Sequence, residues 1–304
     1  MNGDADMNAQ FHRIAVSLAA PLAALILCGP AFADGMRGKA KAKEPAPVQE
    51  RCKYSANVGL TTDYVFRGIS QTSEGPAIQG GFDATCGMFY AGVWASNLDW
   101  GGTGLFGYDG NASVANIEMD WYAGIKGTRG RFSYDLGVIY YSYPNAVGLG
   151  LNNLGDVTSR NYNYVEFKLG ASAEIWKDAT FGATAYYSPD YQYEVGSVWT
   201  FEGAFVQNLH KFTWRREYSP SFSALIGYQT SSGNLGDREL YALNVTGDTN
   251  NYFYWNAGFT IGFLEKWSVD VRYWDTNIDR PGVGCGGSLF ACDERWVGTL
   301  KFTY

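Results

Sequence analysis

Residues 54–67, YSANVGLTTDYVFR, alternate apolar and polar side chains with a period of two. Even positions such as Tyr54 and Leu60 are apolar, whereas odd positions such as Ser55 and Asp63 are polar. This period is typical of a β-strand with one apolar face. Most strands in soluble proteins end after about five or six residues, whereas a tilted strand needs about 9–11 residues to cross a bilayer. The pattern therefore predicts one strand over 54–67 that is long enough to span a membrane.

The same alternation recurs along the rest of the chain. In residues 116–128, Ile117 and Trp121 lie on one face and Glu118 and Asp120 on the other. No stretch has helical periodicity long enough to replace a strand. We count twelve strands, and an even number is typical of bacterial barrels, so the sequence predicts an all-β, transmembrane, antiparallel up-and-down β-barrel over residues 54–304. The further strands are expected at 77–86, 88–98, 116–128, 131–143, 164–174, 181–187, 198–209, 222–230, 253–263, 267–273 and 294–304.

The connections between these strands alternate in length. The second, fourth, sixth and tenth strands are followed by very short connections, for example Gly87 and 129–130. The third, fifth, ninth and eleventh are followed by long ones, such as 99–115 and 231–251. Outer-membrane barrels have short periplasmic turns and longer external loops, so the alternation predicts which end faces the periplasm. Residues 210–221 are the exception on the periplasmic side, and we expect the eighth or ninth strand to extend through them.

Aromatic residues are abundant and charged residues are scarce. The chain has 22 Tyr, 18 Phe and 10 Trp, and only 17% of its residues are charged, whereas globular proteins have about 25%. The net charge of −7 argues against nucleic acid as a partner, because phosphates must be neutralised by Lys and Arg. Long strands with aromatic residues near their ends favour a membrane barrel over a soluble sandwich, since aromatic girdles mark the membrane interfaces.

Residues 1–33 have the features of a cleaved signal peptide. An apolar run at 14–28 follows Arg13, and residues 31–33, AFA, form a cleavage site. The alternative, a retained membrane anchor, needs a longer apolar run with other flanks. Residues 34–53 are rich in Lys and Pro with almost no large apolar side chains, so we expect a flexible periplasmic lead-in there rather than a plug in the lumen.

One stretch also carries a family resemblance. The run TTDYVFRGISQTSEGPAIQGGFD, followed by MFYAGVWASNLDW, is similar to the opening of a proteobacterial outer-membrane family, the TorF-type porins. The similarity covers residues 54–100, with looser similarity in strand rhythm and in the C-terminal strand. It implies a β-barrel and a pore, and it assigns no functional residue. The matching residues are Asp63, Tyr64, Phe66, Arg67, Gly68, Ser70, Gln71, Pro76, Gly80, Gly81, Tyr90, Gly92, Trp94 and Ser96.

Four cysteines remain after removal of the signal: Cys52, Cys86, Cys285 and Cys292. An even number in an exported chain favours disulfides, and three pairings are possible. The midpoint of Cys52 and Cys86 falls in the expected turn at 68–75, so both should lie at the periplasmic ends of adjacent antiparallel strands. Cys285 and Cys292 share the connection after the eleventh strand. We therefore predict the bridges Cys52–Cys86 and Cys285–Cys292 and no metal site, since close C-x-x-C pairs are lacking.

The sequence offers little for catalysis. His210 is the only histidine of the mature chain, and we expect it in a solvated periplasmic turn. A Ser-His or Asp-His mechanism needs a histidine near the outer rim, and the sequence has no G-x-S-x-G, phosphate-loop or HExxH motif. We expect no enzymatic activity and no cofactor. Carboxylate chemistry by the pair Glu118 and Asp120 is the alternative.

The polar face of each strand predicts which charged side chains point inward. Acidic ones outnumber basic ones, so a water-filled path would favour cations modestly. Cross-strand ion pairs that fill the interior are the alternative, and they would give a plugged barrel. Twelve strands lie between the filled eight-stranded and the open sixteen-stranded barrels. The predicted pore-lining residues, with Arg67 at the outer turn, are Asp63, Arg67, Asp83, Glu118, Asp120, Lys126, Asp135, Glu166, Lys168, Glu202, Asp270, Arg272 and Lys301.

The C-terminal strand ends on FTY, residues 302–304, and resembles the signal by which barrel-assembly machinery recognises its clients. The sequence therefore predicts a bacterial outer-membrane, porin-like channel for passive diffusion of small hydrophilic solutes, with weak cation preference. Its expected partners are outer-membrane lipid, the assembly machinery and those solutes. The alternative is a non-conducting structural or adhesive barrel that binds through external loops rich in Asn, Gly and Tyr.

Overall fold

The computed structural model describes residues 52–100, 115–144, 146, 162–192, 196–231, 251–278 and 291–304. The expected signal peptide lies outside these ranges, as does the expected lead-in apart from Cys52 and Lys53. No helix in the described ranges is long and apolar enough to cross a membrane.

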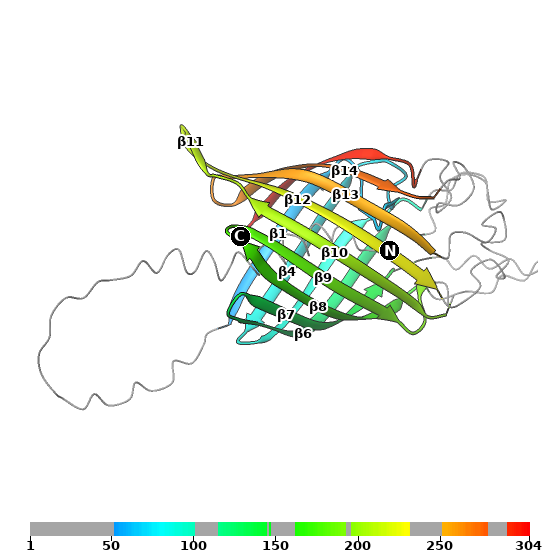
Figure 1. Ribbon diagram of the computed structural model, residues 1–304. Coiled ribbons are helices and arrows are strands. Elements are labelled where there is room, and N and C mark those ends of the chain that lie inside the picture. The colour runs from blue at the N-terminus through cyan, green and yellow to red at the C-terminus, as the bar shows by residue number, and fades with distance from the viewer. Residues whose placement is uncertain are drawn as a thin grey trace, which may run out of the picture.

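Twelve of the described strands pair edge to edge and close into a barrel (Figure 1). Each wall strand pairs antiparallel with the wall strands before and after it in the chain, and β1 pairs with β15 to complete the ring, with Val58 opposite Phe302. The predicted antiparallel up-and-down barrel is thus confirmed. Its wall strands are β1 (Lys53–Thr61), β4 (Ala77–Cys86), β5 (Phe89–Asn97), β6 (Ile117–Arg129), β7 (Phe132–Ser142), β8 (Tyr164–Trp176), β9 (Ala179–Ser188), β10 (Val198–Asn208), β12 (Arg216–Ser231), β13 (Asn251–Phe263), β14 (Trp267–Thr276) and β15 (Arg295–Thr303).

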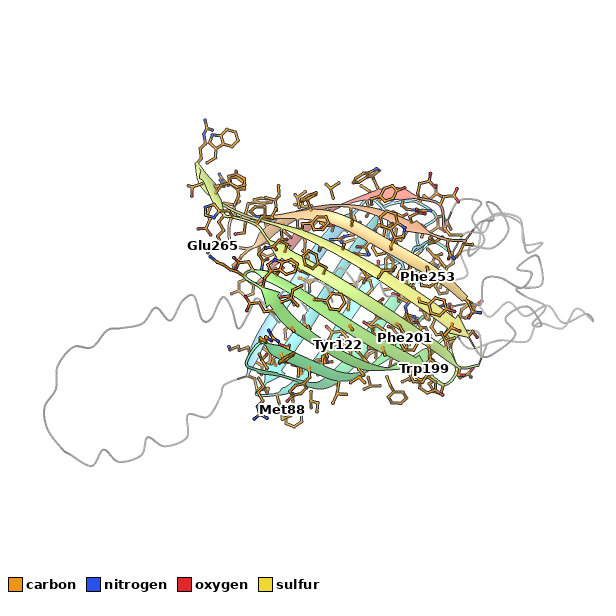
Figure 2. All side chains as sticks on the ribbon, in the orientation of Figure 1. Met88, Tyr122, Trp199, Phe201, Phe253 and Glu265 are labelled. Atoms are coloured by element: carbon orange, nitrogen blue, oxygen red, sulfur yellow. A yellow bond between two sulfur atoms is a disulfide. The ribbon has the colours of Figure 1, made fainter. Side chains whose placement is uncertain are left out.

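The wall is apolar outside and polar inside. In β6, the outward Trp121 is 51% exposed, whereas the inward Glu118 and Asp120 are fully buried. Large apolar side chains cover the outside of the wall, among them the labelled Trp199 and Phe201 (Figure 2). This arrangement suits a barrel surrounded by lipid.

The two ends of the barrel differ. The short-turn end has the tight turns between β4 and β5, β6 and β7, β8 and β9, and β13 and β14. The chain also ends there, after β15, so the C-terminus lies at the short-turn end (Figure 1). The long-connection end is the one at which β5, β7, β12 and β14 finish. These positions agree with the predicted alternation of connection lengths.

Residues 62–76 form an inner hairpin, which differs from the predicted first strand. The expected strand over 54–67 is wrong beyond Thr61, where β1 ends. Two short strands follow, β2 (Val65–Phe66) and β3 (Ile69–Ser70), and they pair with each other in a separate sheet. The chain therefore leaves the wall at the long-connection end and folds into the barrel.

The burial of the inner hairpin explains this difference. Tyr64, Val65 and Phe66 are all buried in succession, so the period of two is lost where the chain enters the interior. Gly68 makes the turn with φ of +83°, and an added Cβ would meet Thr276 of the wall. Such a backbone conformation and such close contact favour glycine. The alternating sequence pattern thus continues past Thr61 although the wall strand ends there, and the alternation alone does not show where the chain turns inward.

A second hairpin projects from the short-turn end. β11 (Phe212–Trp214) pairs with the start of β12, and β12 begins six residues before the predicted ninth strand, at Arg216. We call residues 209–218 the rim hairpin. The prediction that the eighth or ninth strand extends through 210–221 is confirmed for the ninth strand from Arg216 onward, whereas the residues before it contain the separate strand β11 and a turn.

The predicted bridge between Cys52 and Cys86 is present, and it ties β1 to β4 at the short-turn end. Cys292 is also disulfide-bonded. Cys285 lies outside the described residues, so the second predicted pairing stays a prediction.

Candidate functional site

Arg67 is buried inside the barrel, at the tip of the inner hairpin. Its Nη1 and Nη2 each donate to a carboxylate oxygen of Glu166 at 2.9 Å, and both side chains are 1% exposed. Nη1 also donates to Gln229 Oε1 at 3.2 Å and to the Tyr191 hydroxyl at 3.4 Å. The prediction that Arg67 lies at the outer turn is wrong, because the hairpin carries its charge inward to these acceptors.

The carboxylate of Glu166 keeps the buried Arg67 side chain positively charged. Burial alone would lower the pKa of Arg67, but attraction to Glu166 raises it well above its ordinary value. Burial also raises the pKa of Tyr191 to about 12, so its hydroxyl stays neutral and can accept from Arg67. The bidentate pair is the geometry in which a guanidinium binds a carboxylate most strongly. We therefore expect Arg67 to hold the inner hairpin against β8 over the whole physiological pH range.

The base of the inner hairpin is held by Asp63. Its carboxylate accepts from the Ser70 hydroxyl at 2.7 Å, which closes the hairpin on itself. The other oxygen pairs with Arg295 of β15 at 2.9 Å. The neighbouring Tyr64 hydroxyl donates to Glu118 of β6 at 2.9 Å. The hairpin is therefore tied to four separate strands of the wall, β6, β8, β12 and β15.

Aromatic side chains fill the space around the inner hairpin. Phe66 and Tyr186 flank the Arg67 guanidinium, with their ring centroids 4.7 and 5.3 Å from its central carbon. Tyr64 packs edge-on against Trp94 at 5.5 Å. Together these contacts fill much of the interior at the long-connection end with protein.

The interior at the short-turn end is more open. Asp83, Lys126, Asp135 and Lys301 are partly exposed there, in contrast to the buried carboxylates beside the inner hairpin. Asp135 is 24% exposed even though it pairs with Lys168 Nζ at 2.7 Å. The charged interior side chains are thus less buried toward the short-turn end, a zone we call the vestibule, than in the packed zone around the inner hairpin.

Tyrosines lie flat against the vestibule wall because glycines face them. The Tyr90 hydroxyl donates to Asp135 at 2.6 Å, and the Tyr122 hydroxyl donates to Asp83 at 2.7 Å. A Cβ added to Gly92 would overlap the Tyr122 hydroxyl oxygen, because it would lie closer than real Cβ contacts. The glycine therefore gives the ring space beside the wall, where it takes up less of the lumen.

A second cluster of polar contacts, with one ion pair, lies on the side formed by β12, β13 and β14. Arg272 pairs with Asp270 at 2.9 Å and donates to Asn256 at 2.6 Å and to Ser223 at 2.9 Å. Nearby on the wall, the Tyr254 hydroxyl donates to Glu202 at 2.6 Å. Arg272 and Asp270 both lie on β14, so this pair does not join two strands. The interior ion pairs between different parts of the chain, which the sequence left as an alternative, include Arg67 with Glu166 and Lys168 of β8 with Asp135 of β7.

All thirteen predicted pore-lining side chains are buried or partly buried. Their role as the lining of a path stays a prediction. The predictions missed the tyrosines and amides that hydrogen-bond these charges. Tyr122 shares the inward parity of Glu118 and Asp120, and Tyr254 and Asn256 lie on the polar face of their strand, so parity could have identified all three. The buried set is Asp63, Arg67, Glu118, Asp120, Glu166, Lys168, Glu202, Asp270 and Arg272, and the partly buried set is Asp83, Lys126, Asp135 and Lys301.

His210 does not lie beside the charged side chains of the barrel interior. His210 is exposed between β10 and β11, outside the barrel wall. In the described ranges, no three His, Cys, Asp or Glu side chains are grouped as the ligands of a metal ion would be.

A family described as "Bacterial protein of unknown function (Gcw_chp)" matches residues 45–304. The chain belongs to this family. The match covers the whole described barrel, and it leaves the resemblance to TorF-type porins as a prediction. No curated protein matches the chain.

Several solved structures are similar to this Gcw_chp chain. A KdgM porin is 9% identical with a TM-score of 0.46, and the match covers 82% of this chain and 99% of that one. A NanC porin is 8% identical with a TM-score of 0.44, covering 83% and 98%. LpxR from Salmonella typhimurium is 12% identical with a TM-score of 0.43, covering 82% and 99%. None of these similarities assigns a solute or an activity to this chain.

Proposed function

We propose that the chain is a narrow outer-membrane channel for passive diffusion of small hydrophilic solutes. The observation that carries this proposal is a closed barrel with an apolar outside and a charged inside, whose interior charges are partly exposed toward one end. A cylinder of this kind is stable in a bilayer because every strand is paired and no edge meets lipid. The resemblance of residues 54–100 to TorF-type porins supports the same proposal.

The orientation follows from the two ends. Bacterial barrels have their short turns in the periplasm, so the vestibule lies toward the periplasm and the inner hairpin lies toward the cell exterior. The last strand, with Leu300 and Phe302 on its apolar face, supports recognition by the barrel-assembly machinery.

The inner hairpin is the narrowest part of the proposed path. Only small solutes are expected to pass, because Arg67 and its aromatic neighbours are buried together inside the barrel. Carboxylates outnumber basic groups among the interior side chains, so the field along the path favours cations over anions.

Solute flux into liposomes tests this function. Purified protein is reconstituted, and swelling rates are compared for a series of uncharged sugars from trioses to trisaccharides. We expect swelling that falls steeply with solute size. Reversal potentials in a salt gradient across a planar bilayer are expected to show a weak cation preference. A swelling rate equal to that of empty liposomes would refute the channel, and an anion preference would refute the charge argument.

The second candidate function is a non-conducting structural or adhesive barrel. The packed zone around the inner hairpin favours it, since ion pairs and aromatic rings fill that half of the interior. Its binding surface would be the external connections, most of which lie outside the described residues. The absence of flux in the liposome experiment, together with a correctly folded barrel, would select this candidate.

A further inference from the structure

The rim hairpin is the one described element that extends past the short-turn end as an independent ribbon. β11 pairs with β12 through Phe212↔Tyr218 and Trp214↔Arg216 and with no other wall strand. All side chains from 208 to 217 are exposed. A free two-stranded ribbon is only marginally stable in water. Its exposed apolar side chains therefore indicate that another surface covers the rim hairpin.

One face of the rim hairpin continues the apolar outside of the barrel. Antiparallel partners point to the same side of a sheet, so Phe212 and Trp214 share a face with Tyr218 and Arg216. That face runs on from the outward Phe222 of β12, because residues two apart on a strand point to the same side. The rings of Phe212 and Tyr218 are stacked at 5.1 Å, and Trp214 is 72% exposed. The aromatic face is therefore continuous with the surface that contacts lipid.

The tip of the rim hairpin is basic, although the whole chain carries a net charge of −7. Lys211 pairs with Glu217 at 2.8 Å, and both are largely exposed. In the described part of the chain, Arg215 and Arg216 have no acidic side chain within ion-pair distance. Two guanidinium groups without an acidic partner, beside exposed aromatic rings, are complementary to a binding partner whose surface is anionic and partly apolar.

The direction of the rim hairpin selects which surface this is. In Figure 1, β11 lies beyond the barrel end that carries the C-terminus and outside the outline of the barrel, so it leans away from the mouth. It therefore extends over the membrane next to the barrel. Aromatic rings and arginines at this height are the side chains that bind the headgroup region of a bilayer.

We propose that the rim hairpin binds anionic phospholipid headgroups of the periplasmic leaflet. Arg215 and Arg216 contact the phosphates, and Trp214 inserts its ring at the level of the headgroups. The proposal rests on the membrane position given under the proposed function, and it does not depend on conduction. Such binding would give the barrel a preference for anionic over neutral phospholipids in the leaflet around it.

Lipid retention by the full chain tests the proposal. Native mass spectrometry is applied to detergent-purified protein with added phosphatidylglycerol or phosphatidylcholine. We expect tight phosphatidylglycerol adducts on the wild type and adducts at least about tenfold weaker on the double variant Arg215→Gln/Arg216→Gln, since each basic residue near an anionic leaflet contributes substantially. The matched control is Arg129→Gln/Arg131→Gln, which removes two exposed arginines at the β6–β7 turn of the same barrel end. Equal loss in both double variants, or equal retention of the two lipids by the wild type, would overturn the proposal.

Trp214 gives a second readout. Its emission is isolated as the difference between wild type and Trp214→Phe, in vesicles that contain phosphatidylglycerol brominated near the headgroup. We expect this difference to be quenched, and an unquenched difference would show that the hairpin lies away from the bilayer. A dimer mass peak that disappears in Arg215→Gln/Arg216→Gln would assign the surface to a second copy and overturn the lipid site. Liposome flux that stays at the wild-type value in these variants separates this inference from the proposed function.

Discussion

At the scale of single residues, the molecule depends on a buried ion pair that joins two distant parts of the chain. Arg67 and Glu166 are 99 residues apart in the sequence, and both are almost fully buried. Removing one partner of such a pair leaves the other charge without compensation, which costs about 3–5 kcal/mol.

We therefore predict that Glu166→Gln lowers the free energy of unfolding by about 3–5 kcal/mol, whereas Arg67→Met/Glu166→Met together lose much less. The measurement is urea unfolding of the barrel in lipid vesicles. Lys211→Gln is the matched control, because its pair with Glu217 is exposed and should contribute less than about 1 kcal/mol. Equal losses for Glu166→Gln and Lys211→Gln would show that Arg67 does not hold the inner hairpin.

The contact between Gly92 and Tyr122 supplies a second prediction at this scale. We expect Gly92→Ala to lower the free energy of unfolding by about 1–3 kcal/mol, because the new methyl group displaces the Tyr122 ring from the wall. Gly203→Ala is the control, since the nearest atom to its added Cβ is 3.7 Å away, an ordinary contact. Both are measured in the same unfolding assay. If Tyr122→Ala does not relieve the effect of Gly92→Ala, the ring is not the cause.

At the scale of elements, the period-two pattern predicted the wall strands well. Each strand has lipid on one side and polar groups on the other, so the alternation of apolar and polar residues shows which side chains face outward. The inner hairpin was missed because Asp63 and Arg67 have inward parity in either arrangement. Their partners, Arg295 and Glu166, come from strands far along the chain, and no local pattern records that contact.

The bridge between β1 and β4 leads to a prediction for a pair of elements. Cys52 and Cys86 are separated by 34 residues, and a loop of that length corresponds to about 4 kcal/mol of stabilisation in the chain-entropy model. We expect Cys52→Ser/Cys86→Ser to lower the free energy of unfolding by about that amount. Peptide mapping without reduction is expected to recover Cys52 joined to Cys86 and Cys285 joined to Cys292. Crossed pairs or free thiols would contradict the assignment.

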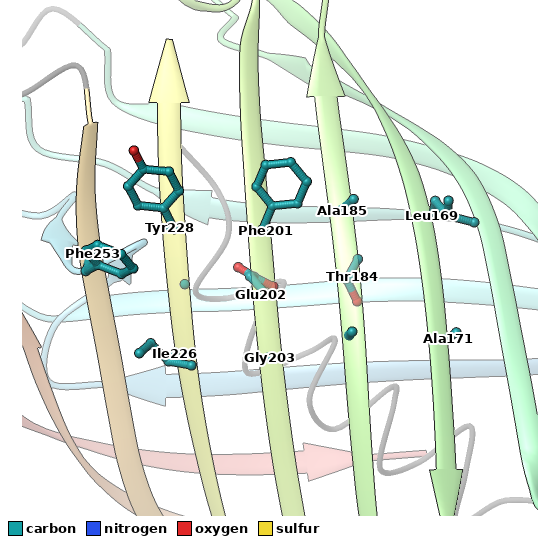
Figure 3. Close-up of a pocket in the computed structure, with 12 residues that line it drawn as sticks. Leu169, Ala171, Thr184, Ala185, Phe201, Glu202, Gly203, Ile226, Tyr228 and Phe253 are labelled. Atoms are coloured by element: carbon teal, nitrogen blue, oxygen red, sulfur yellow. The ribbon is translucent and has the colours of Figure 1, made fainter.

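At the scale of the whole molecule, the barrel joins two zones in series. The wall, its closure and the inward charges followed from the sequence, because they depend on parity and strand number. The division into a vestibule and a packed zone did not, since it depends on where residues 62–76 fold. The outside of the wall is uneven, with a depression over small residues such as Ala171 and Gly203 (Figure 3). In the proposed channel, the segment folded inside the closed wall is the part that limits passage.

The design of the decisive variant follows from the register. Thr61 and Ala77 are direct cross-strand partners, so an Asn-Gly turn in place of residues 62–76 closes the hairpin between β1 and β4 without the inner segment. The matched control replaces residues 210–219 with the same turn, because Leu209 and Pro220 are joined by a backbone hydrogen bond outside the lumen. Single-channel conductance in a planar bilayer is then compared for the three proteins.

We expect small steps for the wild type and the control, and steps several-fold larger for the variant that lacks the inner hairpin. Equal steps in all three proteins, or no steps above the lipid baseline in any of them, would contradict a channel narrowed by the inner hairpin.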